Sequence, residues 1–211
     1  MLKYEKLVYE FRNSKVKWIN PAHNDEWANS LFPKGGYFVE VGACDGIGGS
    51  SCYQLEKKGW KGVCVEPNTK PFKSLIKNRK AICKNYCLSD KNEETIFLEC
   101  AGLSTTIDSF LEKRSHFQKL MKDGEVSIKK AVTLEELLEE VNAPKTIEFL
   151  AMDIEGNEFR VLKNFPFDKY KILAISLEGF ECANFLKKKG YLKVDNPWCK
   201  IKYESYYVLD I

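Results

Sequence analysis

Acidic side chains follow several apolar runs of this chain, at the positions where the strands of a parallel sheet would end. The acids, in chain order, are Glu66 after residues 62–65, Asp153 after residues 147–152 and Glu178 after residues 172–177. Because parallel strands end at one edge of a sheet, we expect these carboxylates to line one ligand site. A carboxylate there can accept hydrogen bonds from hydroxyl groups, accept a proton from a reacting group or bind a cation.

The residues that position Glu66 have the order of a nucleotide cradle. An apolar run at residues 37–41 predicts a buried strand, a helix is expected over residues 50–58, and a second strand leads into Glu66. The glycines between the first strand and the helix are Gly42, Gly46, Gly48 and Gly49. Glycine lets the backbone turn tightly and pass close to a ligand, and an acid at the end of the second strand can bind both hydroxyls of a ribose. The order predicts an adenosine-containing cofactor.

Charge in the glycine loop separates two cofactor classes. A dinucleotide site has the spacing G-x-G-x-x-G, whereas here Gly42 is followed by Gly46, with Glu40 before the loop and Asp45 inside it. Two carboxylates would repel a pyrophosphate, but they suit the sulfonium and ammonium groups of S-adenosylmethionine. The loop therefore favours S-adenosylmethionine, and a purely structural tight turn is the alternative.

Composition is that of an ordinary globular protein. The chain has 211 residues, 44% hydrophobic and 30% charged, with a net charge of +3, so we expect one domain over residues 1–211. Lysine clusters are interspersed with acids and predict solvated faces. No apolar run is long enough to span a membrane, and the eight cysteines form no C-x-x-C pair, so we expect reduced thiols and a cytoplasmic location.

Strands and helices alternate along most of the chain. Residues 1–35 predict a helical N-terminal extension, with helices at 2–11 and 24–32, and residues 36–211 a Rossmann-like core. The further strands are expected at 81–84, 94–99, 126–131, 147–152 and 172–177, and the further helices at 70–79, 107–122, 134–141 and 182–189. Residues 191–194 and 203–209 predict an antiparallel hairpin at the sheet edge. The predicted fold is α/β: a doubly wound, mostly parallel sheet of about seven strands.

Two blocks of sequence, FVEVGACDG with GWKGVCVEPN and then FLAMDIEGNEFRVL, resemble the FkbM-type S-adenosylmethionine-dependent methyltransferases. The resemblance extends over about residues 38–177. It includes the segment GLSTTIDSFLEKRSHF, which carries His116 and is similar to a family segment with a small-residue loop and a histidine.

The resemblance implies the class I methyltransferase fold and methyl transfer to an oxygen, often a hydroxyl of a sugar such as a deoxyhexose in a glycan or glycoconjugate. Carried over by position, Glu66 would bind the ribose. The methionine end would be held by residues of the glycine loop, namely Glu40, Gly42, Ala43, Asp45, Gly46 and Ser51. The adenine would lie against Pro67, Leu88, Ser89 and Asp90.

Methyl transfer to a sugar hydroxyl needs a group that receives the hydroxyl proton, or a cation that stabilises the developing alkoxide. We expect Asp153 to contact the cofactor or the acceptor, and Glu155 to act as the base or as a metal ligand. Glu178 and His116 are further candidates. If a divalent metal binds, the oxygen ligands Asp153, Glu155 and Glu178 would favour Mg²⁺ or Mn²⁺. The alternative for acids in a first helical turn is an interaction with the helix dipole, and an exposed histidine is often only solvated.

Three other functions compete with this interpretation. A nucleic-acid methyltransferase is disfavoured because the chain lacks an N-P-P-Y-type segment and a concentrated basic stripe. An NAD-dependent oxidoreductase is disfavoured by the glycine spacing. The third alternative is a non-catalytic module of a larger glycan-building protein. The sequence predicts no oligomeric state.

Overall fold

The computed structural model describes residues 20–99, 104–107 and 125–210. Its larger sheet has seven strands in the order β10-β11-β9-β8-β1-β2-β3. These strands are β1 (Tyr37–Val41), β2 (Lys61–Val65), β3 (Ile82–Lys84), β8 (Thr146–Met152), β9 (Lys171–Glu178), β10 (Tyr191–Val194) and β11 (Glu204–Leu209). The α/β class, the seven strands and the terminal antiparallel hairpin predicted from the sequence are confirmed.

Strand order reverses between β1 and β8. β1 pairs with β2 on one side and with β8 on the other, all in parallel, and β8 continues in parallel to β9. β11 runs antiparallel to both of its neighbours. In open α/β sheets, ligands bind at the carboxyl ends of the strands where the order reverses. A ligand site is therefore expected at the carboxyl ends of β1, β2 and β8.

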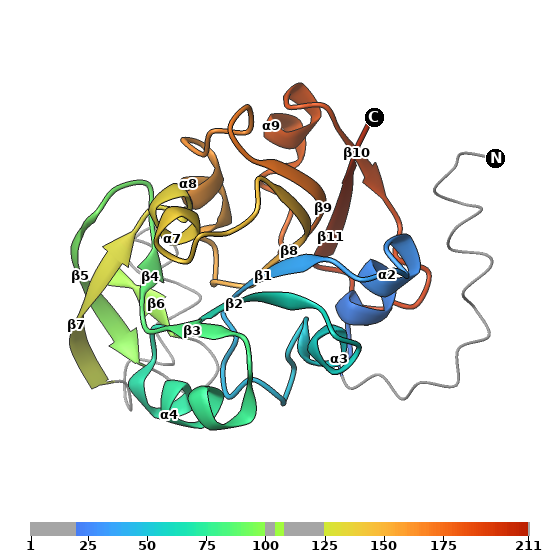
Figure 1. Ribbon diagram of the computed structural model, residues 1–211. Helices are drawn as coiled ribbons and strands as arrows, with labels where there is room; N and C mark the ends of the chain where they lie inside the picture. Colours follow the sequence, from blue (N-terminus) through green and yellow to red (C-terminus); the bar gives the residue numbers. More distant parts are fainter. Residues whose placement is uncertain (1–19, 100–103, 108–124, 211) are drawn as a thin grey trace.

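Helices cover both faces of this sheet (Figure 1). On one face lie α7 (Leu134–Glu140), α8 (Glu158–Leu162) and α9 (Ala183–Lys188), and on the other lie α2 (Asn24–Leu31), α3 (Tyr53–Lys57) and α4 (Thr69–Asn78). The alternation of β1 supplies both faces, because Val39 and Val41 belong to the first core and Phe38 to the second. This two-sided burial explains why the central strands are continuous apolar runs.

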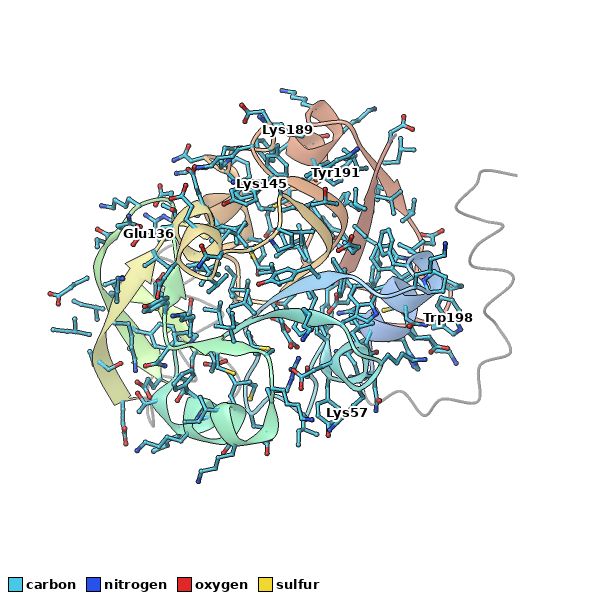
Figure 2. All side chains as sticks on the ribbon, viewed as in Figure 1. Lys57, Glu136, Lys145, Lys189, Tyr191 and Trp198 are labelled. Carbon is cyan, nitrogen blue, oxygen red and sulfur yellow. The ribbon has the colours of Figure 1, made fainter. Side chains whose placement is uncertain are left out.

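Side chains from distant parts of the chain fill these two cores (Figure 2). Tyr191, labelled in Figure 2, is buried in the first core, and its hydroxyl donates a 2.7 Å hydrogen bond to the carbonyl of Ile172. Trp198, also labelled, packs against the second core, which contains Trp27 of α2. The fully buried Trp27 meets Tyr206 edge to face, so α2 is joined to the last strand of the sheet.

A second sheet, not foreseen in the sequence, lies beside the first, toward the left of Figure 1. It has the order β4-β7-β5-β6, with β4 (Cys87–Leu88), β5 (Glu93–Glu99), β6 (Thr105–Thr106) and β7 (Glu125–Val132). The strands expected at 94–99 and 126–131 are present, but they pair with each other in antiparallel fashion over their whole length. The alternation of β5 and β7 indicates a sheet with one covered face, whereas the pairing partners are set by the tertiary structure.

Helix boundaries differ from the prediction mainly after the glycine loop. The helix expected over residues 50–58 begins only at Tyr53, because the Ser50 hydroxyl accepts the Tyr53 N–H at 3.0 Å and residues before it remain in the loop. Thr133 caps the helix expected from residue 134, since its hydroxyl accepts the Glu136 N–H at 3.1 Å. The helices expected at 2–11 and 107–122 lie outside the described residues. No helix in the described part of the chain has the length and hydropathy needed to cross a membrane.

Candidate active site

A cavity of about 230 Å³ opens at the carboxyl ends of β1, β2 and β8, and the second sheet forms its far wall. The first sheet and the loops that follow its strands contribute residues 41–44, the acids Glu66, Asp153 and Glu155, and the neighbouring Asn68, Ile154 and Asn157. The second sheet contributes Cys87, Leu88, Phe97 and residues 104–106. Of the strand-end carboxylates expected at this edge, Glu66 and Asp153 thus line one cavity together with Glu155, whereas Glu178 is not among the lining residues.

The glycine loop starts where the two neighbouring strands come closest. The N–H groups of Gly42 and Ala43 both donate to the carbonyl of Val65, at 2.9 and 3.0 Å, and the Asp153 N–H donates to Val41 at 3.0 Å. Gly42 has φ = +86°, and a Cβ atom there would stand 2.0 Å from the Asp153 carbonyl oxygen. Only glycine fits this position, which leaves the loop backbone open to the cavity.

Glu66 is held at the end of β2 by the backbone. Its Oε2 accepts the Cys44 N–H at 2.8 Å, and its Oε1 accepts the Asn68 N–H at 2.7 Å. The residue is 7% exposed. Burial raises the pKa of this carboxyl, and the two backbone hydrogen bonds lower it in part. Since each carboxylate oxygen retains a lone pair, Glu66 can accept hydrogen bonds from two neighbouring hydroxyls.

The apolar end of the cavity holds some of the predicted adenine contacts and not others. Pro67 and Leu88 line it, as expected, together with Phe97, which the sequence analysis missed. Ser89 and Asp90 lie outside the cavity. Asp90 forms ion pairs with Arg160 at 3.3 Å and Lys163 at 2.7 Å, and the Ser89 hydroxyl donates to Asp90. The side-chain polar atoms of these two residues thus bind each other and, through Asp90, Arg160 and Lys163. The expected adenine contact stays a prediction, and neither residue is among those that line the cavity.

Four predicted ligands of the methionine end also lie outside the cavity. The acids among them hold the loop itself: Glu40 accepts the Ser51 N–H at 2.6 Å, and Asp45 accepts the Gly48 N–H at 2.8 Å. The Ser51 hydroxyl accepts hydrogen bonds from Asn20 and Asn24, and Gly46 packs against helix α4. In the structure these residues shape the loop, and the residues of the loop that line the cavity are Gly42, Ala43, Cys44, Gly48 and Gly49.

Three carboxylates converge at the other end of the cavity. Oxygen atoms of Asp153, Glu155 and Glu178 lie within 4.8 Å of one another. Burial, followed by the charge of Asp153, raises the pKa of Glu178 to about 8. Asp153 is open to the cavity but closely surrounded on its other sides, and this loss of hydration raises its pKa while a hydrogen bond from Glu178 lowers it. The two acids therefore share a proton near neutral pH.

Comparison with protein families decides the assignment. The model of the methyltransferase FkbM domain matches residues 40–193. The chain belongs to the FkbM methyltransferase family. The match begins at Glu40 and includes Glu66 and the three converging carboxylates, so it covers the cavity edge of the first sheet.

Solved methyltransferase structures show a distant likeness to this FkbM chain. The crystal structure of a fibrillarin/Nop5p complex aligns at 12% identity, covers 99% of this chain and 82% of that chain, and has a TM-score of 0.38. The human methyltransferase 10 domain containing protein aligns at 13% identity over 98% of this chain and 79% of that chain, with a TM-score of 0.38. A search of curated protein sequences found no match.

A fourth acid, Glu204 of β11, lies beside the cluster of Asp153, Glu155 and Glu178. Glu204 stands opposite Glu178 in the register of β11 and β9. Burial, followed by the charge of Asp153, raises its pKa to about 7. The sequence analysis missed Glu204, although a signal existed: an antiparallel strand that pairs with β9 brings its first residue next to the last residue of β9. Glu158, by contrast, accepts the Ile154 N–H at 3.0 Å and supports the turn.

Residues 104–106 form part of the cavity wall. The Asn68 side chain donates to the Ser104 hydroxyl at 3.0 Å, and the Asn157 side chain donates to the Thr106 hydroxyl at 3.3 Å. These two bonds attach residues 104–106 to both ends of the site. His116 lies outside the described residues, so its expected role stays a prediction.

The lining suits the S-adenosylmethionine that the FkbM family implies. Among the described residues, the cavity has carboxylates from Glu66, Asp153 and Glu155 and no lysine, arginine or histidine. Such a lining matches a ligand with sulfonium and ammonium groups and opposes a pyrophosphate. Glu66 fits the ribose hydroxyls, the open backbone at Gly42 fits close approach, and Leu88 with Phe97 offers an apolar wall for the adenine ring.

Proposed function

We propose that this protein is an S-adenosylmethionine-dependent O-methyltransferase that acts on a hydroxyl of a sugar in a glycan or glycoconjugate. The observation that carries the proposal is the acidic cavity, with Glu66 fixed by two backbone N–H groups at one end and converging carboxylates at the other. S-adenosylmethionine, when bound, supplies an electrophilic methyl group. Glu66 would hold its ribose, Pro67, Leu88 and Phe97 its adenine, and residues 42–44 its methionine part.

The carboxylate cluster suits an acceptor whose proton must be removed. A sugar hydroxyl is a weak nucleophile at neutral pH, and a positioned base contributes about 10²- to 10⁴-fold to such a reaction. In this proposal Asp153, which lines the cavity, contacts the acceptor hydroxyl. The hydroxyl proton passes to the carboxylate cluster of Asp153, Glu155 and Glu178. Holding the hydroxyl beside the reacting carbon contributes a further part of the acceleration. His116 remains a second candidate base.

A divalent cation is the alternative partner of the same carboxylates. Three carboxylate oxygens within 4.8 Å of one another form a donor set of the kind that Mg²⁺ or Mn²⁺ prefers. At this position such a cation would stabilise a developing alkoxide. We propose Asp153, Glu155 and Glu178 as its ligands.

The direct test is methyl transfer to a panel of sugars. The protein would be incubated with S-adenosylmethionine and mono- and oligosaccharides that include deoxyhexoses, with and without EDTA, and products would be analysed by mass spectrometry. We expect a mass gain of about one methylene on a sugar oxygen. Methylation of an amine or of nucleic acid in parallel reactions, with none on sugars, would contradict the acceptor. Loss of activity in EDTA that Mn²⁺ restores would support the metal.

Ligand preference tests the cofactor separately from the acceptor. In a thermal-shift assay, S-adenosylhomocysteine should raise the melting temperature and NAD should not, because the lining opposes a pyrophosphate. A shift with NAD alone would favour an oxidoreductase. Binding of S-adenosylhomocysteine without transfer to any acceptor would favour a non-catalytic module.

We also propose that residues 1–211 act as one domain in the cytoplasm. The seven cysteines in the described part of the chain are all free, which supports a reducing compartment. Labelling of thiols in freshly lysed cells would test this location: the proposal fails if the cysteines are already oxidised.

A further inference from the structure

We infer that Arg79 is a positioning residue for the methyl-donor site, which it shapes by holding the glycine loop from behind through Glu40, Ser50 and Gly46. The inference rests on the proposed cofactor, because the loop matters only if that cofactor binds in the cavity. Arg79 itself does not line the cavity. It is the C-terminal cap of α4 and lies 39 residues beyond Glu40 in the chain.

One guanidinium nitrogen makes all the contacts with the loop. Arg79 Nη1 donates to Glu40 Oε2 at 2.8 Å, to the Ser50 hydroxyl at 3.0 Å and to the Gly46 carbonyl at 3.3 Å. The other oxygen of Glu40 accepts the Ser50 hydroxyl at 2.7 Å and the Ser51 N–H at 2.6 Å. Arg79 and Glu40 thus contact the loop at its middle and at its end.

The contacts are buried and charged, so they are strong constraints on the loop. The side chain of Arg79 is 0% exposed and that of Glu40 is 2% exposed. Removing one partner of a buried ion pair leaves the other charge without compensation, and water cannot replace it. The loop has little space to move, since a Cβ atom on Gly46 would stand 2.7 Å from the Cγ atom of Arg79. Gly48 and Gly49 of the same loop line the cavity.

Arg79 has a second carboxylate partner that does not touch the loop. Its Nε donates to Glu56 Oε2 at 3.1 Å, and Glu56 also accepts the N–H groups of Lys80 and Ala81. The Glu56 side chain is 8% exposed, close to the burial of Glu40. Glu56→Gln is therefore a matched control for Glu40→Gln: both change one carboxylate of the same arginine, and only Glu40 is bonded to the loop.

The experiment is calorimetric titration of the full chain with S-adenosylhomocysteine, at a temperature where every variant is folded. Outer partners that orient a binding group contribute about 10- to 100-fold to affinity in metal sites, and we expect Glu40→Gln to lose about tenfold here. Glu56→Gln should bind S-adenosylhomocysteine within about twofold of the unmodified chain, even if its melting temperature falls as much as that of Glu40→Gln. Arg79→Lys should behave like Glu40→Gln, because an ammonium group cannot reproduce the fork of a guanidinium.

Hydrogen exchange gives a readout that does not depend on the ligand. In Glu40→Gln the amide of Ser51 should exchange faster relative to the rest of the protein, and in Glu56→Gln it should not. Ser50→Ala, which removes the hydroxyl between Glu40 and Arg79, replaces Glu40→Gln if that variant does not fold. Equal losses of affinity in Glu40→Gln and Glu56→Gln, or no loss in either, would overturn the inference and leave the proposed cofactor standing. Failure of the unmodified chain to bind would overturn both.

Discussion

Gly42 lies against the backbone of Asp153, and the space between them is too small for any side chain on Gly42. The two residues follow the neighbouring parallel strands β1 and β8, in which Val41 pairs with Met152. The start of the glycine loop and the first acid of the carboxylate cluster are therefore joined in one unit. A ligand that touches the loop at Gly42 is beside Asp153.

Gly42→Ala should disrupt this contact. A Cβ atom would stand 2.0 Å from the Asp153 oxygen at φ = +86°, so we expect a loss of about 3 kcal/mol of unfolding free energy and of most binding of S-adenosylhomocysteine. Gly49→Ala is the matched control, with φ = +73° and no atom within 4 Å of its Cβ. It should lose only about 1 to 2 kcal/mol, the cost of the backbone conformation. Equal losses in urea unfolding would show that the close approach does not matter.

Glu66→Ala should weaken binding of S-adenosylhomocysteine by about 1 to 3 kcal/mol, because it removes the acceptor proposed for the ribose hydroxyls. Glu66→Gln keeps one carbonyl oxygen and should lose less. Calorimetric titration measures both, and Glu139→Ala serves as the surface control, because Glu139 is exposed, pairs with Lys169 and does not line the cavity. Full affinity in Glu66→Ala would falsify the ribose assignment.

Asp153→Asn should retain the fold and lose about 100-fold or more in turnover. An amide of the same shape keeps the contacts of the turn but cannot accept a proton, and it no longer shares one with Glu178. Turnover is measured as S-adenosylhomocysteine formed in the presence of the acceptor, and affinity for the cofactor should change by only about a few-fold. A fully active Asp153→Asn would remove Asp153 from the mechanism.

Stability should fall as pH rises through neutrality. The pKa of Glu178 is raised from 4.5 to about 8 in the folded protein, so folding takes up protons in this interval. Its contribution is fully present below about pH 4.5 and is lost as pH rises through about 8. Because Glu178 is only partly buried, solvent screening reduces the effect of its shifted pKa. Glu178→Gln, which removes the ionisation, should therefore gain about 1 to 2 kcal/mol relative to the unmodified chain between pH 5 and 8.5. Urea unfolding at these pH values measures the difference, and parallel pH profiles would contradict the shared proton.

Much of the first sheet could be predicted because its signals are local. An apolar run that ends in Glu66 or Asp153 specifies a buried parallel strand and the edge at which its acid emerges. Glycines at turns, and a Thr133 cap, mark where helices and loops begin. The same local order favoured S-adenosylmethionine through Glu40 and Asp45, but both of these acids lie outside the cavity. The acidic lining that opposes a pyrophosphate comes from Glu66, Asp153 and Glu155.

The sequence by itself determined the central strands, the glycine loop and the row of acids, since each depends on neighbours in the chain. Only the tertiary structure decided which way those acids face. Glu40 points to Arg79 and not to the cavity, β5 and β7 leave the main sheet and pair with each other, and Glu204 joins Glu178 across β11 and β9. The physical reason is that a buried charge takes the partner that packing brings to it, and packing joins residues far apart in the chain.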